Sequence, residues 1–145
     1  MKVAIASDHA GFDLKNEIKD FIIQEMDLNC KDFGCFEKQS VNYPDYALKV
    51  GKSIIDGQYQ LGILICGTGI GMSMAANKIK GIRAALCHDT FSARMTRKHN
   101  DANILTMGSR VIGTGLAKDI VQIWLLADFS KDKRHLVRIN KMTAI

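Results

Sequence analysis

The stretch that decides the fold is Ile63-Leu64-Ile65-Cys66-Gly67-Thr68-Gly69-Ile70-Gly71-Met72-Ser73-Met74-Ala75-Ala76-Asn77-Lys78. It opens with a short apolar run, which predicts a buried strand, and closes with Ala and Met residues that favour a helix. The glycines at alternate positions between them allow a sharp turn and a close approach of a ligand to the backbone amides. Free N–H groups at the start of such a helix favour an anion or a developing negative charge. The stretch therefore predicts a strand, a ligand-binding loop and a helix in direct succession.

The glycine loop Gly67–Gly71 departs from two well-known phosphate-binding motifs. Its third glycine comes one place early for the dinucleotide-binding fingerprint, and the loop lies in mid-chain instead of in the first strand–helix unit. No Gly-Lys-Ser/Thr follows, so it is not a Walker loop. A nucleotide-binding module stays open as an alternative, although this chain lacks the full motif of such modules. Cys66 is either a small buried hydrophobe or a reactive thiol, and the spacing alone allows both.

Length and composition indicate one domain over residues 1–145, because 145 residues can bury a core and 47% of them are hydrophobic. No apolar run is long enough for a membrane span, and Asp8 brings charge too early for a signal peptide, so we expect a cytoplasmic protein with no membrane partner. The four cysteines lack zinc-site spacing and suit free thiols in a reducing cytosol. The net charge of +5 is modest and forms no basic stripe, so we expect no nucleic-acid partner.

Apolar runs alternate with helical patterns along the chain. The expected strands are Val3–Ala6, Leu28–Phe33, Leu61–Ile65, Ile82–Cys87 and Asn103–Met107. This alternation predicts an α/β fold, a three-layer α/β/α Rossmann-like sandwich around a five-stranded parallel sheet. Arg134–Met142 predicts a C-terminal helical extension after a polar hinge.

Three helices carry expectations about single side chains. The apolar spacing of the first helix puts Lys15 on its exposed face. Asp89 or Thr90 is expected to cap the helix after the fourth strand, and Thr114 the long helix that carries Trp124.

Polar clusters mark the ends of the expected strands and helices: Asp8-His9, Cys66–Gly71, His99-Asn100 and Ser109-Arg110. Ligands bind at the carboxyl ends of parallel strands, so Asp8-His9 and Cys66 face one crevice if the first and third strands are neighbours. Each residue also has an ordinary structural interpretation. Asp8 can cap a helix, His99 can complement a helix dipole, and the arginines can be solvated surface.

A series of motifs, in order over almost the whole chain, resembles ribose-5-phosphate isomerase type B. They are Ser7-Asp8-His9-Ala10-Gly11, Tyr43-Pro44-Asp45, Ile65-Cys66-Gly67-Thr68-Gly69-Ile70-Gly71, Ala75-Ala76-Asn77-Lys78, His99-Asn100-Asp101, Gly108-Ser109-Arg110 and Arg134-His135 with Arg138. The resemblance implies an aldose–ketose isomerase that uses no metal and no cofactor. It would interconvert D-ribose 5-phosphate and D-ribulose 5-phosphate, in the pentose phosphate pathway, through an enediolate.

The resemblance also implies a role for each residue of the site. Cys66 would be the base that moves a proton between carbons 1 and 2, while Thr68 and the amides of Gly67, Gly69 and Gly71 hold the enediolate oxygen. His99, with Asp8 nearby, would open the furanose ring. The expected substrate contacts are Tyr43 and Asn100 to sugar hydroxyls, and His9, Arg110, Arg134 and Arg138 to the phosphate. Part of the family uses a glutamate base, at a position that corresponds here to Met72, which assigns the chain to the cysteine subtype.

The expected assembly is a homodimer, or a tetramer, in which two chains share each active site. The terminal segment 131–145 would then pack on the partner subunit. Two alternatives concern the substrate and the activity. The chain could isomerise a six-carbon aldose phosphate, such as allose 6-phosphate or galactose 6-phosphate, or it could be a non-catalytic sugar-phosphate-binding module.

Overall fold

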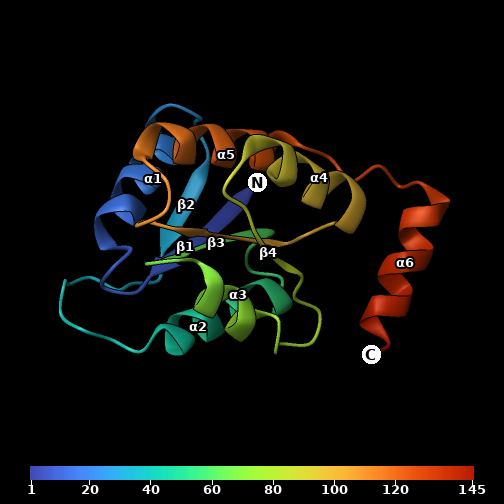
Figure 1. Ribbon diagram of the computed structural model, residues 1–145, viewed down its shortest axis with the longest axis horizontal. Coiled ribbons are helices and arrows are strands. Elements are labelled where there is room, and N and C mark those ends of the chain that lie inside the picture. Colours follow the sequence, from blue (N-terminus) through green and yellow to red (C-terminus); the bar gives the residue numbers. More distant parts are fainter.

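The computed structural model describes the whole chain, residues 1–145, as five strands and six helices (Figure 1). The strands are β1 Lys2–Ser7, β2 Asn29–Asp32, β3 Leu61–Cys66, β4 Ala84–Leu86 and β5 Ile104–Gly108. The helices are α1 Phe12–Gln24, α2 Tyr43–Ile55, α3 Ile70–Ala76, α4 Thr90–Asn100, α5 Thr114–Leu126 and α6 Lys133–Thr143. The expected sandwich and C-terminal helix are confirmed, although β2 and β4 are shorter than the sequence indicates. None of the six helices has both the length and the apolar character needed to cross a membrane.

All the strands are parallel, in the order β2-β1-β3-β5-β4. β3 is central and every one of its residues is buried, which explains its unbroken apolar sequence. β1 and β3 are neighbours, with Ser7 opposite Ile65. The first and third strands therefore end side by side, as the crevice between Asp8 and Cys66 requires.

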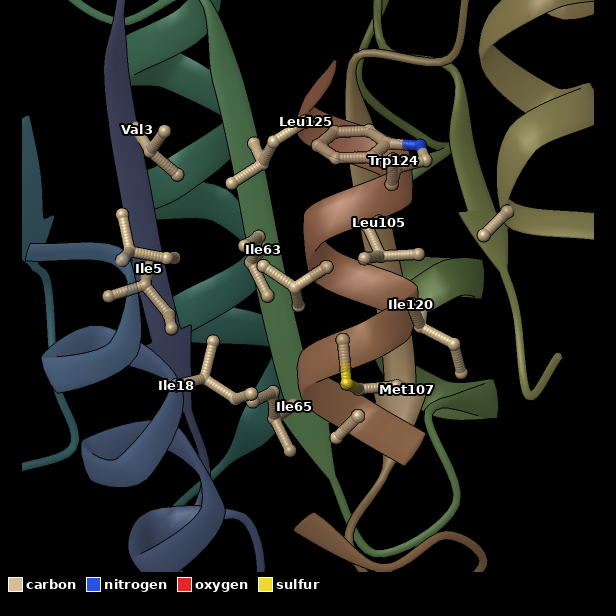
Figure 2. Close-up of a cluster of buried hydrophobic side chains, with 14 of the residues drawn as sticks. Val3, Ile5, Ile18, Ile63, Ile65, Leu105, Met107, Ile120, Trp124 and Leu125 are labelled. Carbon is tan, nitrogen blue, oxygen red and sulfur yellow. The ribbon is translucent and has the colours of Figure 1, made fainter. Parts of the chain in front are cut away.

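Helices cover both faces of the sheet (Figure 1). On one face, Ile63 and Leu105 of the strands pack against Trp124 and its neighbours on α5 (Figure 2), together with residues of α1 and α4. On the other face, α2 and α3 close a smaller core around Leu64 and Met72. The buried residues of α5 recur at helical spacing, which is why this helix lies flat on the sheet: Ala117, Ile120, Val121, Trp124 and Leu125.

Different residues lie at the two edges of the sheet where the strands begin and where they end. We call the edge where the strands end the carboxyl edge, and the edge where they begin the amino edge. α4 starts at Thr90, beyond the end of β4, and ends at Asn100, shortly before β5 begins. His99 and Asn100 therefore lie at the amino edge. α6 begins beside them, because His135 packs on His99, and it stands apart from the sheet (Figure 1).

Two expectations about single side chains are wrong, and one is confirmed. Lys15 is fully buried instead of exposed, because its ammonium group is paired with Asp32 at 2.7 Å and donates to the carbonyl of Cys35 at 2.7 Å. Thr114 does not cap α5, since it is the first residue of the helix and Gly113 stands at the cap. Asp89 does cap α4, where its carboxylate accepts the amide N–H of Ser92 at 2.6 Å.

Candidate active site

Asp8 is held in place where β1 and β3 end. Its amide donates to the carbonyl of Ile65 at 3.2 Å, and its carboxylate accepts the N–H of Gly11 at 3.1 Å. A Cβ at Gly11 would lie 2.5 Å from the carbonyl oxygen of Ile65, so only glycine allows this close approach. The carboxylate thus closes the turn before α1 and stays nearly buried at the carboxyl edge.

Cys66 is the last residue of β3, and its sulfur faces the glycine loop. The N–H of Gly69 donates to the sulfur at 3.1 Å. Gly69 has a φ of +76°, and a Cβ there would lie 2.7 Å from the carbonyl carbon of Met107, so the path of the loop requires glycine. An N–H that donates to sulfur interacts more strongly with a thiolate than with a thiol. The loop therefore directs one backbone N–H at the sulfur of Cys66.

The other cysteines have different surroundings. Burial raises the pKa of Cys30 to about 12, with the charge of Asp32 adding to the effect. Burial likewise raises the pKa of Cys87 to about 11. Cys35 is buried beside the hydroxyl of Ser7, at 3.9 Å. Only Cys66, of the four, accepts a backbone N–H on its sulfur.

Thr68 and Tyr43 lie at the open side of the loop. Both are exposed, and the hydroxyl of Thr68 accepts the N–H of Ile70 at 3.3 Å. Tyr43 begins α2, and its ring lies so close to Gly71 that a Cβ there would come within 2.7 Å of it. The phenol of Tyr43 and the hydroxyl of Thr68 are thus available to a ligand on the loop.

Arg110 and His9 add N–H donors to the same edge. The amide of Arg110 donates to the carbonyl of Gly67 at 3.0 Å, and its side chain lies over that glycine. Nδ1 of His9 accepts the N–H of Val41 at 3.3 Å, which leaves Nε2 as the nitrogen that can donate to an anion. Both residues lie where a phosphate group could reach them.

Ser109 is a positioning residue to which sequence reasoning assigned no role. Its amide donates to the carbonyl of Cys66 at 2.9 Å, and its hydroxyl donates to the carbonyl of Ala10 at 2.8 Å. It thereby joins the ends of β1, β3 and β5. Its sequence signals were its place in a polar cluster after the fifth strand and in the Gly108-Ser109-Arg110 motif.

The remaining candidates form a second group at the amino edge. His99 and Asn100 are exposed at the end of α4, and Arg134 and Arg138 are exposed on α6. The structure does not bring this group together with Asp8 or Cys66 within one chain. The expected neighbourhood of His99 and Asp8 is therefore absent from the single chain, because α4 runs from one edge of the sheet to the other.

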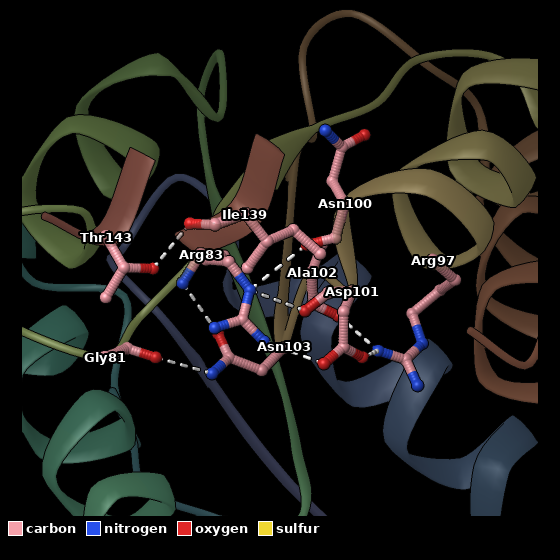
Figure 3. A network of polar contacts seen from close by, with 9 residues as sticks. All are labelled: Gly81, Arg83, Arg97, Asn100, Asp101, Ala102, Asn103, Ile139 and Thr143. Carbon is pink, nitrogen blue, oxygen red and sulfur yellow. Dashed lines mark hydrogen bonds and ion pairs between the residues drawn. The ribbon is translucent and has the colours of Figure 1, made fainter. Parts of the chain in front are cut away.

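A network of polar contacts fixes the turn that follows His99 and Asn100 (Figure 3). Asp101 has a φ of +46°, and its carboxylate is paired with Arg83 and with Arg97, each at 2.9 Å. Arg83 also donates to the carbonyls of Asn100 and Asp101, at 3.1 and 2.9 Å. Since two guanidinium groups hold one turn, the end of α4 has a defined position.

The fold and this site define the class of protein. The chain matches the Ribose/Galactose Isomerase family over residues 3–142, and it belongs to that family. The solved structure of Clostridium thermocellum ribose-5-phosphate isomerase B is similar, with 50% identity and a TM-score of 0.96 over 99% of this chain and 96% of the other. D-erythrulose-4-phosphate isomerase of Pectobacterium atrosepticum is 48% identical over 131 residues, 89% of this chain and 85% of the relative.

A third relative, from Bacillus subtilis, is 56% identical over 144 residues, 99% of this chain and 95% of its own length, and has the provisional name of sugar phosphate isomerase. The chain is therefore an enzyme, a sugar phosphate isomerase. The resemblance to the type B ribose-5-phosphate isomerases is confirmed.

Proposed function

We propose that the chain interconverts D-ribose 5-phosphate and D-ribulose 5-phosphate, with Cys66 as the base. The observation that carries the proposal is the hydrogen bond from Gly69 to the sulfur of Cys66, in a loop flanked by Asp8 and Arg110. The name of the Clostridium thermocellum enzyme supports the choice of substrate. The four free cysteines suit the reducing cytoplasm, where the pentose phosphate pathway would use this reaction.

In the proposed mechanism, the thiolate of Cys66 takes the proton from carbon 2 of the open aldose and returns it to carbon 1, while the hydroxyl proton on oxygen 2 passes to oxygen 1. The negative charge passes to the oxygens of the enediolate, which need donors that are already in place. Thr68 and the amides of Gly67 and Gly71 are the proposed donors. The amide of Gly69 is engaged by sulfur, so its part is to support the base. No step needs a metal ion or a cofactor.

We propose that the second half of the site comes from a second copy of the chain. His99 and Asn100 would open the ring and contact the sugar, and Arg134 and Arg138 would bind the phosphate with His9 and Arg110. Because the two groups lie at opposite edges of one sheet, a two-fold homodimer, alone or within a tetramer, would bring them together.

Exposed apolar residues on α3 and α4 support this assembly. Ile70 and Met74 of α3 are 48% and 66% exposed, and Phe91 at the start of α4 is 69% exposed. Side chains of this size are usually buried, and a subunit interface would bury them. In the same arrangement, α6 and the rest of segment 131–145 would pack on the partner.

The function is tested by measuring ribulose 5-phosphate formation from ribose 5-phosphate with a chelator present. Cys66→Ala should lower the rate by about 10²–10⁴-fold or more, because it removes the proton-transfer group. Cys30→Ala is the matched control and should keep the wild-type rate. A folded Cys66→Ala variant with near wild-type turnover would remove the thiol from the mechanism.

The same assay decides between the alternatives. Faster turnover of allose 6-phosphate or galactose 6-phosphate would identify a six-carbon isomerase. Binding of sugar phosphates without turnover would identify a non-catalytic module.

A further inference from the structure

His135 is the one buried side chain of α6, 5% exposed on a helix that is otherwise open to solvent. Its ring packs on that of His99, with the ring centroids 4.4 Å apart and the planes inclined by 38°. The side chain of His99 is exposed and makes no hydrogen bond within the chain. Contact with the ring of His135 is therefore the one side-chain interaction that the structure gives His99.

Ser130 fixes His135 in turn. Its hydroxyl lies 2.7 Å from Nδ1 of His135 and accepts the N–H of Asp132 at 3.2 Å. Its amide donates to the carbonyl of Lys98 at 3.1 Å, one residue before His99. Ser130 thus connects the segment between α5 and α6 to the end of α4. His135 and His99 are therefore held in fixed positions relative to one another.

Burial and the neighbouring charges favour the neutral form of His135. Burial lowers its pKa, and the positive groups of His99, Arg134 and Arg138 lower it further, while Asp132 acts in the opposite direction. A neutral ring can accept the hydroxyl proton of Ser130 at Nδ1, whereas an imidazolium cannot. A neutral ring also does not repel His99 when His99 carries a proton.

We propose that His135 is a positioning residue that holds His99 in the orientation needed to open the sugar ring. The inference rests on the proposed function, in which His99 transfers a proton to or from the ring oxygen. A general acid or base must lie within hydrogen-bond reach of its proton, and an exposed side chain at a helix end otherwise samples several rotamers. Packing on His135 removes this freedom before substrate binds.

The experiment compares His135→Gln, which removes the ring, with His135→Phe, which keeps a ring without the contact to Ser130. Thr143→Ala, on the last turn of α6, is the control. His135→Gln should lower kcat for ribose 5-phosphate by about 10- to 100-fold, because misplacement of a catalytic group by about 1 Å costs that much. KM should change less than about twofold, since no substrate ligand is lost. His135→Phe should recover much of kcat, and Thr143→Ala should match wild type.

NMR spectra of the ring protons of His99 give a readout that does not depend on activity. These signals should shift in His135→Gln, which loses the ring current of His135, and return toward wild type in His135→Phe. Unchanged His99 signals, or an unchanged kcat in His135→Gln, would overturn the positioning role. Absence of wild-type turnover of ribose 5-phosphate would instead contradict the proposed function, and the spectra would still decide whether the rings of His135 and His99 are in contact.

A four-carbon substrate separates ring opening from the later proton transfer. D-erythrulose 4-phosphate, the substrate in the name of the Pectobacterium relative, cannot close a furanose ring because it is a 2-ketose with only four carbons, and its aldose isomer cannot close one because the oxygen on carbon 4 carries the phosphate. If wild type converts it, His135→Gln should lose activity on ribose 5-phosphate and keep most of its activity on this compound. An equal loss on both would contradict a role in ring opening.

Discussion

The N–H of Gly69 and the sulfur of Cys66 lie 3.1 Å apart, three residues along one loop and joined by a hydrogen bond. The contact exists because Gly69 takes a backbone conformation that other residues rarely adopt, pressed against the backbone of Met107. The chemistry proposed for the thiol therefore depends on the shape of the loop. Each change that moves the loop should act on the reactivity of Cys66.

Gly69→Ala should abolish most of the activity and slow the alkylation of Cys66 by iodoacetamide, because the added Cβ meets backbone atoms and displaces the N–H from sulfur. Gly57→Ala is a matched control, since Gly57 also has a positive φ of 72° but its Cβ would meet nothing within 4 Å. It should cost about 1–2 kcal/mol of stability and leave the rate per folded molecule unchanged. Equal alkylation rates in the two variants would show that the thiol does not depend on Gly69.

Arg138→Ala should raise KM for ribose 5-phosphate by about 10- to 100-fold and weaken competition by inorganic phosphate, because a charge-assisted contact to the phosphate is lost. Lys141→Ala removes a positive charge from the same helix and serves as the control. An unchanged inhibition constant for phosphate in Arg138→Ala would exclude this arginine from the phosphate site.

A mixture of Cys66→Ala and His99→Asn chains should regain activity when the two are unfolded together and refolded. If the two residues of a pocket come from different chains, a hybrid dimer has one intact pocket and one pocket with both lesions. Half the dimers are hybrids after random exchange, so activity should approach roughly a quarter of wild type. Mass spectrometry verifies that hybrids have formed. Hybrids without activity would show that each chain supplies both residues of its own pocket.

His135 predicts a pH dependence of stability. In the unfolded chain the pKa of His135 is the ordinary value of 6.5. In the folded chain, burial and positive neighbours lower this pKa. Between these two values the unfolded state binds more protons, so the free energy of unfolding falls as the pH is lowered through this range. When the pH is lowered from about 8 to about 5.5, the Tm of His135→Phe should fall less than the Tm of wild type. An identical loss in both proteins would contradict this assignment.

Much of the fold could be predicted from local patterns. The central strand, the glycine loop and the helix after it were visible in the sequence because each depends on short-range spacing. Lys15 could not be placed, because its burial depends on Asp32, seventeen residues away on another element. The burial of an ammonium group is decided by its partner, and helical periodicity contains no information about that partner.

The division of the candidate site between two edges followed from a signal that was available. His99 and Asn100 end a helix, and a helix that follows a parallel strand ends at the opposite edge of the sheet. The resemblance already implied that two chains share each active site, and the position of His99 at a helix end gives the physical reason. The contact between His99 and His135 depends on how α6 docks, which the sequence pattern did not reveal.

The position of α6 has a consequence for how such enzymes diverge. Its one buried side chain is His135, so most of its surface can change without loss of core packing. The helix also carries two of the cations proposed for the phosphate. After a gene duplication, selection for a shorter or longer substrate can therefore act first on the exposed positions of this helix, while the strand ends that carry the thiol stay as they are.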